Sequence, residues 1–111
     1  MQADNRTPVG RFAPTPSGRM HLGNVFAALM SYLSVKSQGG NWILRMEDLD
    51  TQRTKTEYAQ TLREDLRWLG LDWDGEMPPQ SARSSVYEGY FRRLEELGLV
   101  YPCYCTRSQL H

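Results

Sequence analysis

The sequence has few features of a secreted or membrane protein. Its only cysteines, Cys103 and Cys105, are too close together to close a loop, which excludes an ordinary disulfide-stapled fold. Residues 1–8 lack the basic segment and following apolar stretch of a secretory signal. The longest apolar run, residues 25–33, is far shorter than the roughly 20 residues that span a bilayer. We therefore expect a cytoplasmic protein with no membrane partner.

The sequence also lacks an excess of charge of either sign. Its 13 Lys and Arg residues balance 13 Asp and Glu residues, so any contact with nucleic acid must come from a local patch. The hydrophobic fraction of 40% is enough for a core and argues against general disorder. A chain of 111 residues fits one modest domain and is short for an enzyme with several large substrates. We expect it to be part of a larger protein.

Extended and helical patterns alternate along the chain, which predicts an α/β fold. Residues 9–13 read as a strand that ends at two prolines. Residues 41–46 read as a second strand, and its run of apolar side chains is typical of a strand covered on both faces. Between them, the spacing predicts a helix from His21 to the glycines at 39–40, with an apolar stripe of Leu22, Phe26, Leu29, Met30 and Leu33.

Two further helices are predicted in the second half of the chain. Thr54-x-x-Glu57 and Ser85-x-x-Glu88 are typical of capping boxes, and residues 71–80 between these helices read as a loop. Each helix would bury an apolar stripe and end at a glycine: Tyr58, Leu62, Leu66 and Leu69 before Gly70, and Val86, Tyr90, Leu94 and Leu97 before Gly98.

Residues 11–24 place polar groups at a strand end and at the start of a helix, where open α/β sheets bind ligands. A helix start offers backbone N–H groups to an anion, and Gly23 would let a nucleotide approach the backbone. His21 could donate to a phosphate oxygen. From these residues alone, however, a surface or capping role for His21 is favoured.

Two linked motifs carry a family resemblance. RFAPTPSG at residues 11–18 followed by HLGN at 21–24, and LRMEDLD at 44–50, resemble the signatures of class I aminoacyl-tRNA synthetases of the glutamate group. The resemblance covers almost the whole chain from Gly10. It implies the N-terminal part of a Rossmann-like class I nucleotide-binding fold, with residues 1–9 as a tail, 10–98 in the catalytic domain and 99–111 opening a zinc-binding insertion.

The resemblance implies an amino-acid site. Arg11 matches the family arginine that holds the substrate carboxylate, a task suited to the guanidinium fork, and Glu47 matches the carboxylate that pairs with the α-amino group of L-glutamate. The other residues expected to bind glutamate are Phe12, Ala13, Pro14 and Thr15. Without the resemblance, Glu47 and its acidic neighbours read as a solvated turn or a weak divalent-cation site.

The resemblance also implies that His21, Gly23 and Asn24 bind ATP and serve catalysis. Asn24 stands where a second histidine is common in the family, and an amide cannot become cationic. A mechanism with two imidazolium groups is therefore not expected. The implied reaction is attack of the glutamate carboxylate on the α-phosphate of ATP, with Mg²⁺ supplying part of the positive charge.

Cys103 and Cys105 lie in residues 100–105, which read as a strand or a metal-binding turn. Two thiolates so close can supply half of a tetrahedral Zn²⁺ site, and in similar enzymes the other ligands lie further along the chain, beyond His111. His111 is a weaker alternative as a third ligand. A different class stays open, namely a zinc-stabilised RNA-binding module without catalysis that would use basic side chains such as Arg83, Arg92, Arg93 and Arg107.

Two members of the group compete: the full-length glutamyl-tRNA synthetases, and the shorter glutamyl-queuosine enzymes, which glutamylate the queuosine base of tRNA(Asp). Sequence details around PSG at 16–18, WDG at 73–75 and QSAR at 80–83 favour the glutamyl-queuosine enzymes. We therefore expect a monomeric enzyme with tRNA(Asp) as its partner. The chain lacks the Lys-Met-Ser-Lys-Ser-type loop of class I enzymes, so we expect it to be incomplete.

Overall fold

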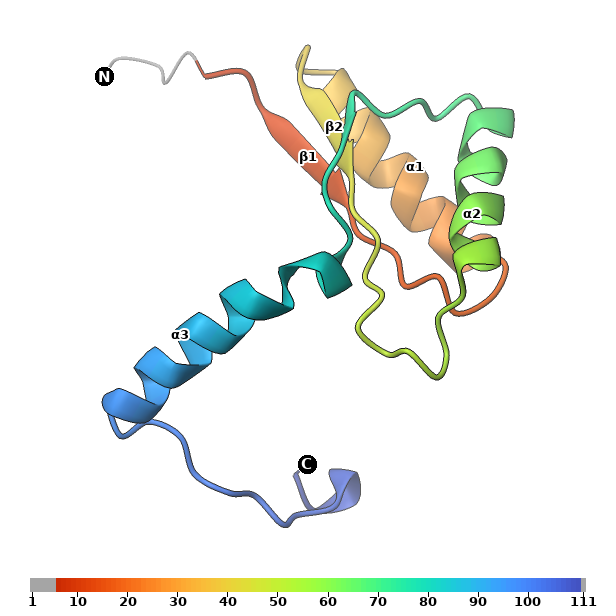
Figure 1. Ribbon diagram of the computed structural model, residues 1–111. Helices are drawn as coiled ribbons and strands as arrows, with labels where there is room; N and C mark the ends of the chain where they lie inside the picture. Colours follow the sequence, from red (N-terminus) through yellow and green to blue (C-terminus); the bar gives the residue numbers. More distant parts are fainter. Residues whose placement is uncertain (1–5, 111) are drawn as a thin grey trace.

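The computed structural model describes residues 6–110 as an open α/β fold (Figure 1). Its elements are β1 (Val9–Phe12), α1 (Leu22–Lys36), β2 (Asn41–Leu44), α2 (Thr56–Trp68), β3 (Gly75–Glu76), the 3₁₀ turn η1 (Gln80–Arg83), α3 (Ser84–Glu96) and the 3₁₀ turn η2 (Arg107–Gln109). The three strands form a parallel sheet in the order β1-β2-β3. The predicted Rossmann-like α/β class is therefore confirmed.

The parallel register brings the carboxyl ends of β1 and β2 to the same edge of the sheet. Phe12 is the partner of Leu44, and the backbone pairing continues past the strands, because Arg45 N–H donates to the Phe12 carbonyl at 3.0 Å and Glu47 N–H donates to the Pro14 carbonyl at 2.9 Å. The segments after both strands are thus held side by side. These are the segments that carry the two sequence motifs.

The core lies between the sheet and the helices α1 and α2, which cover one of its faces (Figure 1). Trp42 is fully buried; its ring stacks on Phe12 at 5.9 Å and meets Tyr32 edge-on at 5.3 Å between centroids. Its indole N–H donates to Ser31 Oγ at 2.8 Å. The cluster is completed by small and aliphatic side chains: Ala28, Val35, Leu44, Met46, Leu62, Leu66 and Leu71.

The predicted inward stripe of α1 was wrong. Phe26 is 62% exposed and Leu22 is 84% exposed, and Leu29, Met30 and Leu33 are exposed too, whereas the buried residues of α1 are Ala28 and Val35. The reason is close approach: a Cβ on Gly10 would lie 3.0 Å from Val35 Cβ. The helix therefore meets the sheet through its smaller side chains.

The stripe predicted for α3 is also exposed, since no residue of that helix is buried. In Figure 1, α3 projects away from the sheet and from α1 and α2. Its nearest described neighbour is η1, so the side chains of Val86, Tyr90, Leu94 and Leu97 have no core to enter. Trp42 and Leu44 are buried while Ile43 is only partly so, which corrects the expectation that β2 is covered on both faces.

Neither predicted capping box forms. The helix α2 begins at Thr56 after an N-cap of Lys55, because Thr54 Oγ1 donates instead to the Asp50 carbonyl at 2.7 Å. The helix α3 begins at Ser84, directly after η1, without a side-chain cap. The glycine ends of both helices are confirmed by the positive φ of Gly70 and Gly98, 75° and 69°.

The segment predicted as a loop at 71–80 contains β3, which was missed. Asp74, directly before β3, holds this segment against β2. Its backbone N–H donates to the Trp42 carbonyl at 2.8 Å, and its Oδ2 accepts from Trp42 N–H at 2.7 Å and from Lys36 Nζ at 2.6 Å. A strand at 100–105 was wrong, because those residues are irregular and exposed. Within residues 6–110, no helix has the length and apolarity to cross a membrane.

Acid is expected to weaken the link that Asp74 makes between α1 and β2. The hydrogen bond from Lys36, and then that from Trp42 N–H, lower the pKa of Asp74 below its ordinary 3.8. A carboxylate whose pKa is lower in the folded state adds stability that is complete above the unfolded pKa and is lost as the pH falls through the folded pKa. Urea unfolding from pH 7 to pH 2.5 should show a smaller acid loss for Asp74→Asn than for the wild type. Equal losses would contradict this role.

Candidate active site

A cavity of about 390 Å³ opens at the carboxyl edge of the sheet, between the end of β1 and the start of α1. Its volume lies in the range of small-molecule sites. It gathers six of the residues that the sequence predicted for glutamate and ATP: Phe12, Ala13, Pro14, Thr15, His21 and Asn24. Residues that the sequence analysis did not assign also line it: Ser17, Gly18, Arg19, Met20 and Leu62.

His21 caps the start of α1. Its Nδ1 accepts hydrogen bonds from the backbone N–H groups of Gly23 at 3.1 Å and Asn24 at 3.3 Å. The backbone N–H groups that were expected to be available to an anion are therefore already hydrogen-bonded, and His21 has the capping role that the residues alone favoured. Because Nδ1 accepts, the neutral ring carries its proton on Nε2. That atom is left as a donor on an exposed side chain.

Gly23 and Asn24 complete the same turn. A Cβ on Gly23 would lie 3.0 Å from His21 Cε1 and 3.1 Å from Nδ1, so glycine makes room here for the capping imidazole. Asn24 Oδ1 accepts from His21 N–H at 3.1 Å. The Asn24 amide oxygen is thus used inside the turn, and its NH₂ group remains a donor beside the cavity. The Nε2–H group of His21 and the NH₂ group of Asn24 are both neutral donors that suit an anionic ligand.

Arg11 and Glu47 lie on the other face of the sheet and do not line this cavity. Arg11 pairs with Ile43 across β1 and β2, and side chains alternate along a strand, so Arg11, Arg45 and Glu47 share the face opposite Phe12. Glu47 lies three residues beyond the end of β2 at Leu44, and no contact between Arg11 and Glu47 is found among the described residues. The structure therefore puts them on one surface without direct contact.

The partner of Glu47 in this structure is Arg45, which the sequence analysis missed. Arg45 Nε and Nη2 donate to Glu47 Oε1 at 3.1 and 2.5 Å. The hydrogen bond to Glu47 raises the pKa of Arg45 above its usual value. The signal was present as a cation and an anion two positions apart at a strand end, where alternation puts both side chains on one face.

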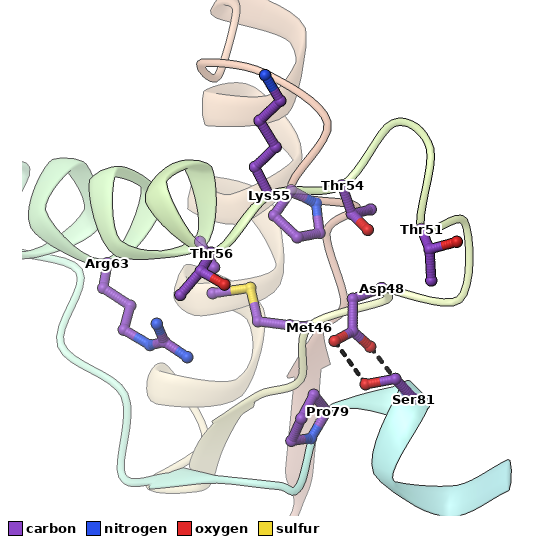
Figure 2. A pocket seen from close by; sticks show the side chains of 11 residues that line it. Met46, Asp48, Thr51, Thr54, Lys55, Thr56, Arg63, Pro79 and Ser81 are labelled. Carbon is purple, nitrogen blue, oxygen red and sulfur yellow. Dashed lines mark hydrogen bonds between the residues drawn. The ribbon is translucent and has the colours of Figure 1, made fainter.

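A second hollow, of about 360 Å³, lies beside the end of β2 (Figure 2). Asp48 Oδ1 accepts from Ser81 N–H at 2.8 Å, and its Oδ2 accepts from Ser81 Oγ at 2.7 Å. Figure 2 shows these two bonds tying the motif at 44–50 to η1. Asp48 is thus a structural partner of Ser81, and the reading of residues 47–50 as one solvated acidic turn does not fit Glu47 or Asp48.

Cys103 and Cys105 are exposed free thiols. No group of three or more His, Cys, Asp or Glu side chains positioned for a metal ion occurs in the described part of the chain, 6–110. These residues alone therefore do not fit a tetrahedral zinc site. His111, the alternative third ligand, lies outside the described residues.

Comparison with known proteins places this geometry in a family. Residues 8–111 match the family described as tRNA synthetases class I (E and Q), catalytic domain. Glutamate–tRNA ligase 2 of Alkalilimnicola ehrlichii is 51% identical over 108 residues, which cover 90% of this chain and 23% of the relative. The glutamyl-Q tRNA(Asp) synthetase of Symbiobacterium thermophilum is 49% identical over 109 residues, which cover 91% of this chain and 34% of the relative.

A solved structure agrees. A glutamate tRNA ligase from Elizabethkingia meningosepticum, in complex with its amino acid, is similar with a TM-score of 0.80 and 35% identity, over 95% of this chain and 22% of that one. The chain thus spans between 22% and 34% of the length of these relatives. With its paired strands, capped helix and matching motifs, the chain belongs to the catalytic-domain family of class I tRNA synthetases for glutamate and glutamine.

Proposed function

We propose that this chain supplies part of the ATP and amino-acid site of a ligase that activates L-glutamate in the cytoplasm and transfers it to the queuosine base of tRNA(Asp). The observation that carries the proposal is the cavity at the carboxyl edge of the sheet beside β1, because six of the residues predicted to bind glutamate and ATP meet in it. Residues 10–98 would form the first part of the catalytic domain and 99–111 the beginning of an insertion.

Both substrates would meet at the carboxyl edge of the sheet. ATP would enter the cavity, where the Nε2–H of His21 and the NH₂ group of Asn24 can donate to phosphate oxygens. The amino acid would lie against Arg11 and Glu47, which read its carboxylate and its ammonium group. Mg²⁺ supplies further positive charge when bound. Alignment of the carboxylate with the α-phosphate is then the main contribution of the protein.

The dual role of His21 predicts different outcomes for two substitutions. His21→Asn keeps a good N-cap but lacks the distant ring N–H, so ATP should bind roughly tenfold or more weakly, since hydrogen bonds to charged groups contribute about 1.5–3 kcal/mol. His21→Ala should lose that contact and also about 0.5–2 kcal/mol of stability. ATP titration and urea unfolding separate the two effects. An Asn variant with wild-type ATP affinity would contradict the phosphate contact.

A specific observation favours a second candidate, transfer to the terminal ribose of tRNA(Glu) by an ordinary glutamate–tRNA ligase. A relative named glutamate–tRNA ligase is 51% identical to this chain and one named glutamyl-Q tRNA(Asp) synthetase is 49% identical, so similarity supports both candidates to nearly the same degree. The family match over 8–111 speaks against an independent RNA-binding module.

Labelled glutamate and periodate-treated tRNA distinguish the two candidates, because periodate destroys the terminal ribose diol. The test uses the full natural-length polypeptide that contains this sequence. Label on the treated tRNA supports transfer to queuosine, provided that tRNA lacking queuosine stays unlabelled. Label only on untreated tRNA supports the ordinary ligase.

Zinc is part of the same proposal. Cys103 and Cys105 would supply two ligands, and two more must come from outside the described residues. The full natural-length protein should contain about one zinc ion per chain, measured by elemental analysis, and Cys103→Ser should lose it. Metal-free protein with full activity would contradict a structural zinc site.

A further inference from the structure

The ion pair between Arg45 and Glu47 has an asymmetric geometry. Both guanidinium nitrogens that contact Glu47, Nε at 3.1 Å and Nη2 at 2.5 Å, donate to the same oxygen, Oε1. No hydrogen bond to Oε2 is found among the described residues. One carboxylate oxygen is therefore held by two donors while the other keeps its capacity to accept.

The pair is also largely removed from water. The side chains of Arg45 and Glu47 are only 17% and 20% exposed. Exposed ion pairs hold two flexible side chains weakly, whereas a mostly buried pair with more than one hydrogen bond fixes both.

The backbone beneath the pair is fixed as well. Arg45 and Glu47 donate their N–H groups to carbonyls of the β1 segment at 3.0 and 2.9 Å. On the other side, Gln80 N–H donates to the Met46 carbonyl at 2.9 Å, and Asp48 is bonded twice to Ser81. Because the main chain around Glu47 is hydrogen-bonded on both sides, the direction of the Glu47 carboxylate depends on its contact with Arg45.

We propose that Arg45 is a positioning residue. Its two hydrogen bonds fix Glu47 Oε1, so that Oε2 faces the ammonium group of the substrate amino acid. This inference rests on the proposed function, in which Glu47 reads that group. Lysine would supply the charge but only one nitrogen, so it could not provide the two-nitrogen grip of the guanidinium. Arg45 itself would not touch the substrate.

The test measures glutamate-dependent ATP–pyrophosphate exchange in the full natural-length protein, with total tRNA present. Arg45→Ala should raise the KM for glutamate by roughly tenfold to a hundredfold, because small misplacements at a reacting site have effects of that order. The KM for ATP should stay unchanged. Arg45→Lys should lie between the wild type and Arg45→Ala, and it keeps the proposal testable if the Ala variant does not fold.

Arg63→Ala is the matched control, because Arg63 also contacts a carboxylate through two nitrogens: its Nε donates to Glu76 Oε1 and Oε2 at 3.0 and 3.2 Å, and its Nη2 donates to Oε1 at 2.6 Å. It should leave the KM for glutamate unchanged.

An equal KM for glutamate in Arg45→Ala and Arg63→Ala, or an equal rise in the KM for ATP, would overturn the positioning role alone. Absence of glutamate-dependent exchange in the wild type would overturn the proposed function and this inference with it.

Discussion

Replacement of Glu47 by alanine is expected to abolish glutamate-dependent ATP–pyrophosphate exchange while ATP binding survives. Removing one partner of a hydrogen-bonded charge pair weakens binding, because the other charge is left unpaired. Here the substrate ammonium group and the guanidinium of Arg45 would both lose their carboxylate. The exchange rate measures the first effect, and ATP titration shows that the nucleotide site is intact.

Two controls separate the loss of charge from a loss of structure. Glu47→Gln keeps the shape of the side chain and should also lose exchange. Glu76→Ala removes a similar partner, that of Arg63 at 2.6 Å, from a position outside the proposed site, and should retain exchange. Normal exchange by Glu47→Ala would refute the role of Glu47.

Replacement of Trp42 by alanine is expected to give the largest loss of stability, about 3–5 kcal/mol. Trp42 is 0% exposed, and it connects β2 to Phe12 of β1 and to Tyr32 and Ser31 of α1. Its removal leaves a cavity at the centre of the β1-α1-β2 layer. The shift in the urea unfolding midpoint measures this loss.

Trp68 provides a control of the same residue type. It is 85% exposed at the end of α2, so Trp68→Ala should change the unfolding free energy by no more than about 0.5 kcal/mol. Equal losses for the two tryptophan variants would mean that the core lies elsewhere.

The first half of the fold could be predicted because the positions of proline and glycine agree there with the periodicity of the apolar residues. Two prolines end β1, and Gly39, with a φ of 68°, lies just after α1. What failed was the choice of faces, because hydrophobicity alone favours Phe26 over Ala28 as a core residue. Packing reversed that choice, since the close approach of α1 to Gly10 admits only small side chains.

The second half was harder for a related reason. The exposed apolar side chains of α3 have the periodicity of a core helix, and periodicity does not reveal whether a partner surface is present in the same chain. The two-residue strand β3 was hidden in an Asp- and Gly-rich segment, where Asp74 replaces a longer ladder with side-chain bonds to Trp42 and Lys36.

At the site, the motifs predicted which residues gather but not how they bond to one another. His21 and Phe12 line one cavity, and their roles in binding stay predictions. The occupation of the helix-start N–H groups by His21 and the pairing of Glu47 with Arg45 depend on rotamers, which spacing does not specify. Arg11 and Glu47 share a face of the sheet, and their joint contact with a substrate stays a prediction.

The most direct test is a structure of the full natural-length protein with a non-hydrolysable glutamyl-adenylate analogue. We predict that its adenosine phosphate lies in the cavity at the start of α1, beside His21, and that its ammonium group lies about 3 Å from Glu47 Oε2. An analogue bound elsewhere, with Glu47 turned away from the ligand, would contradict the account.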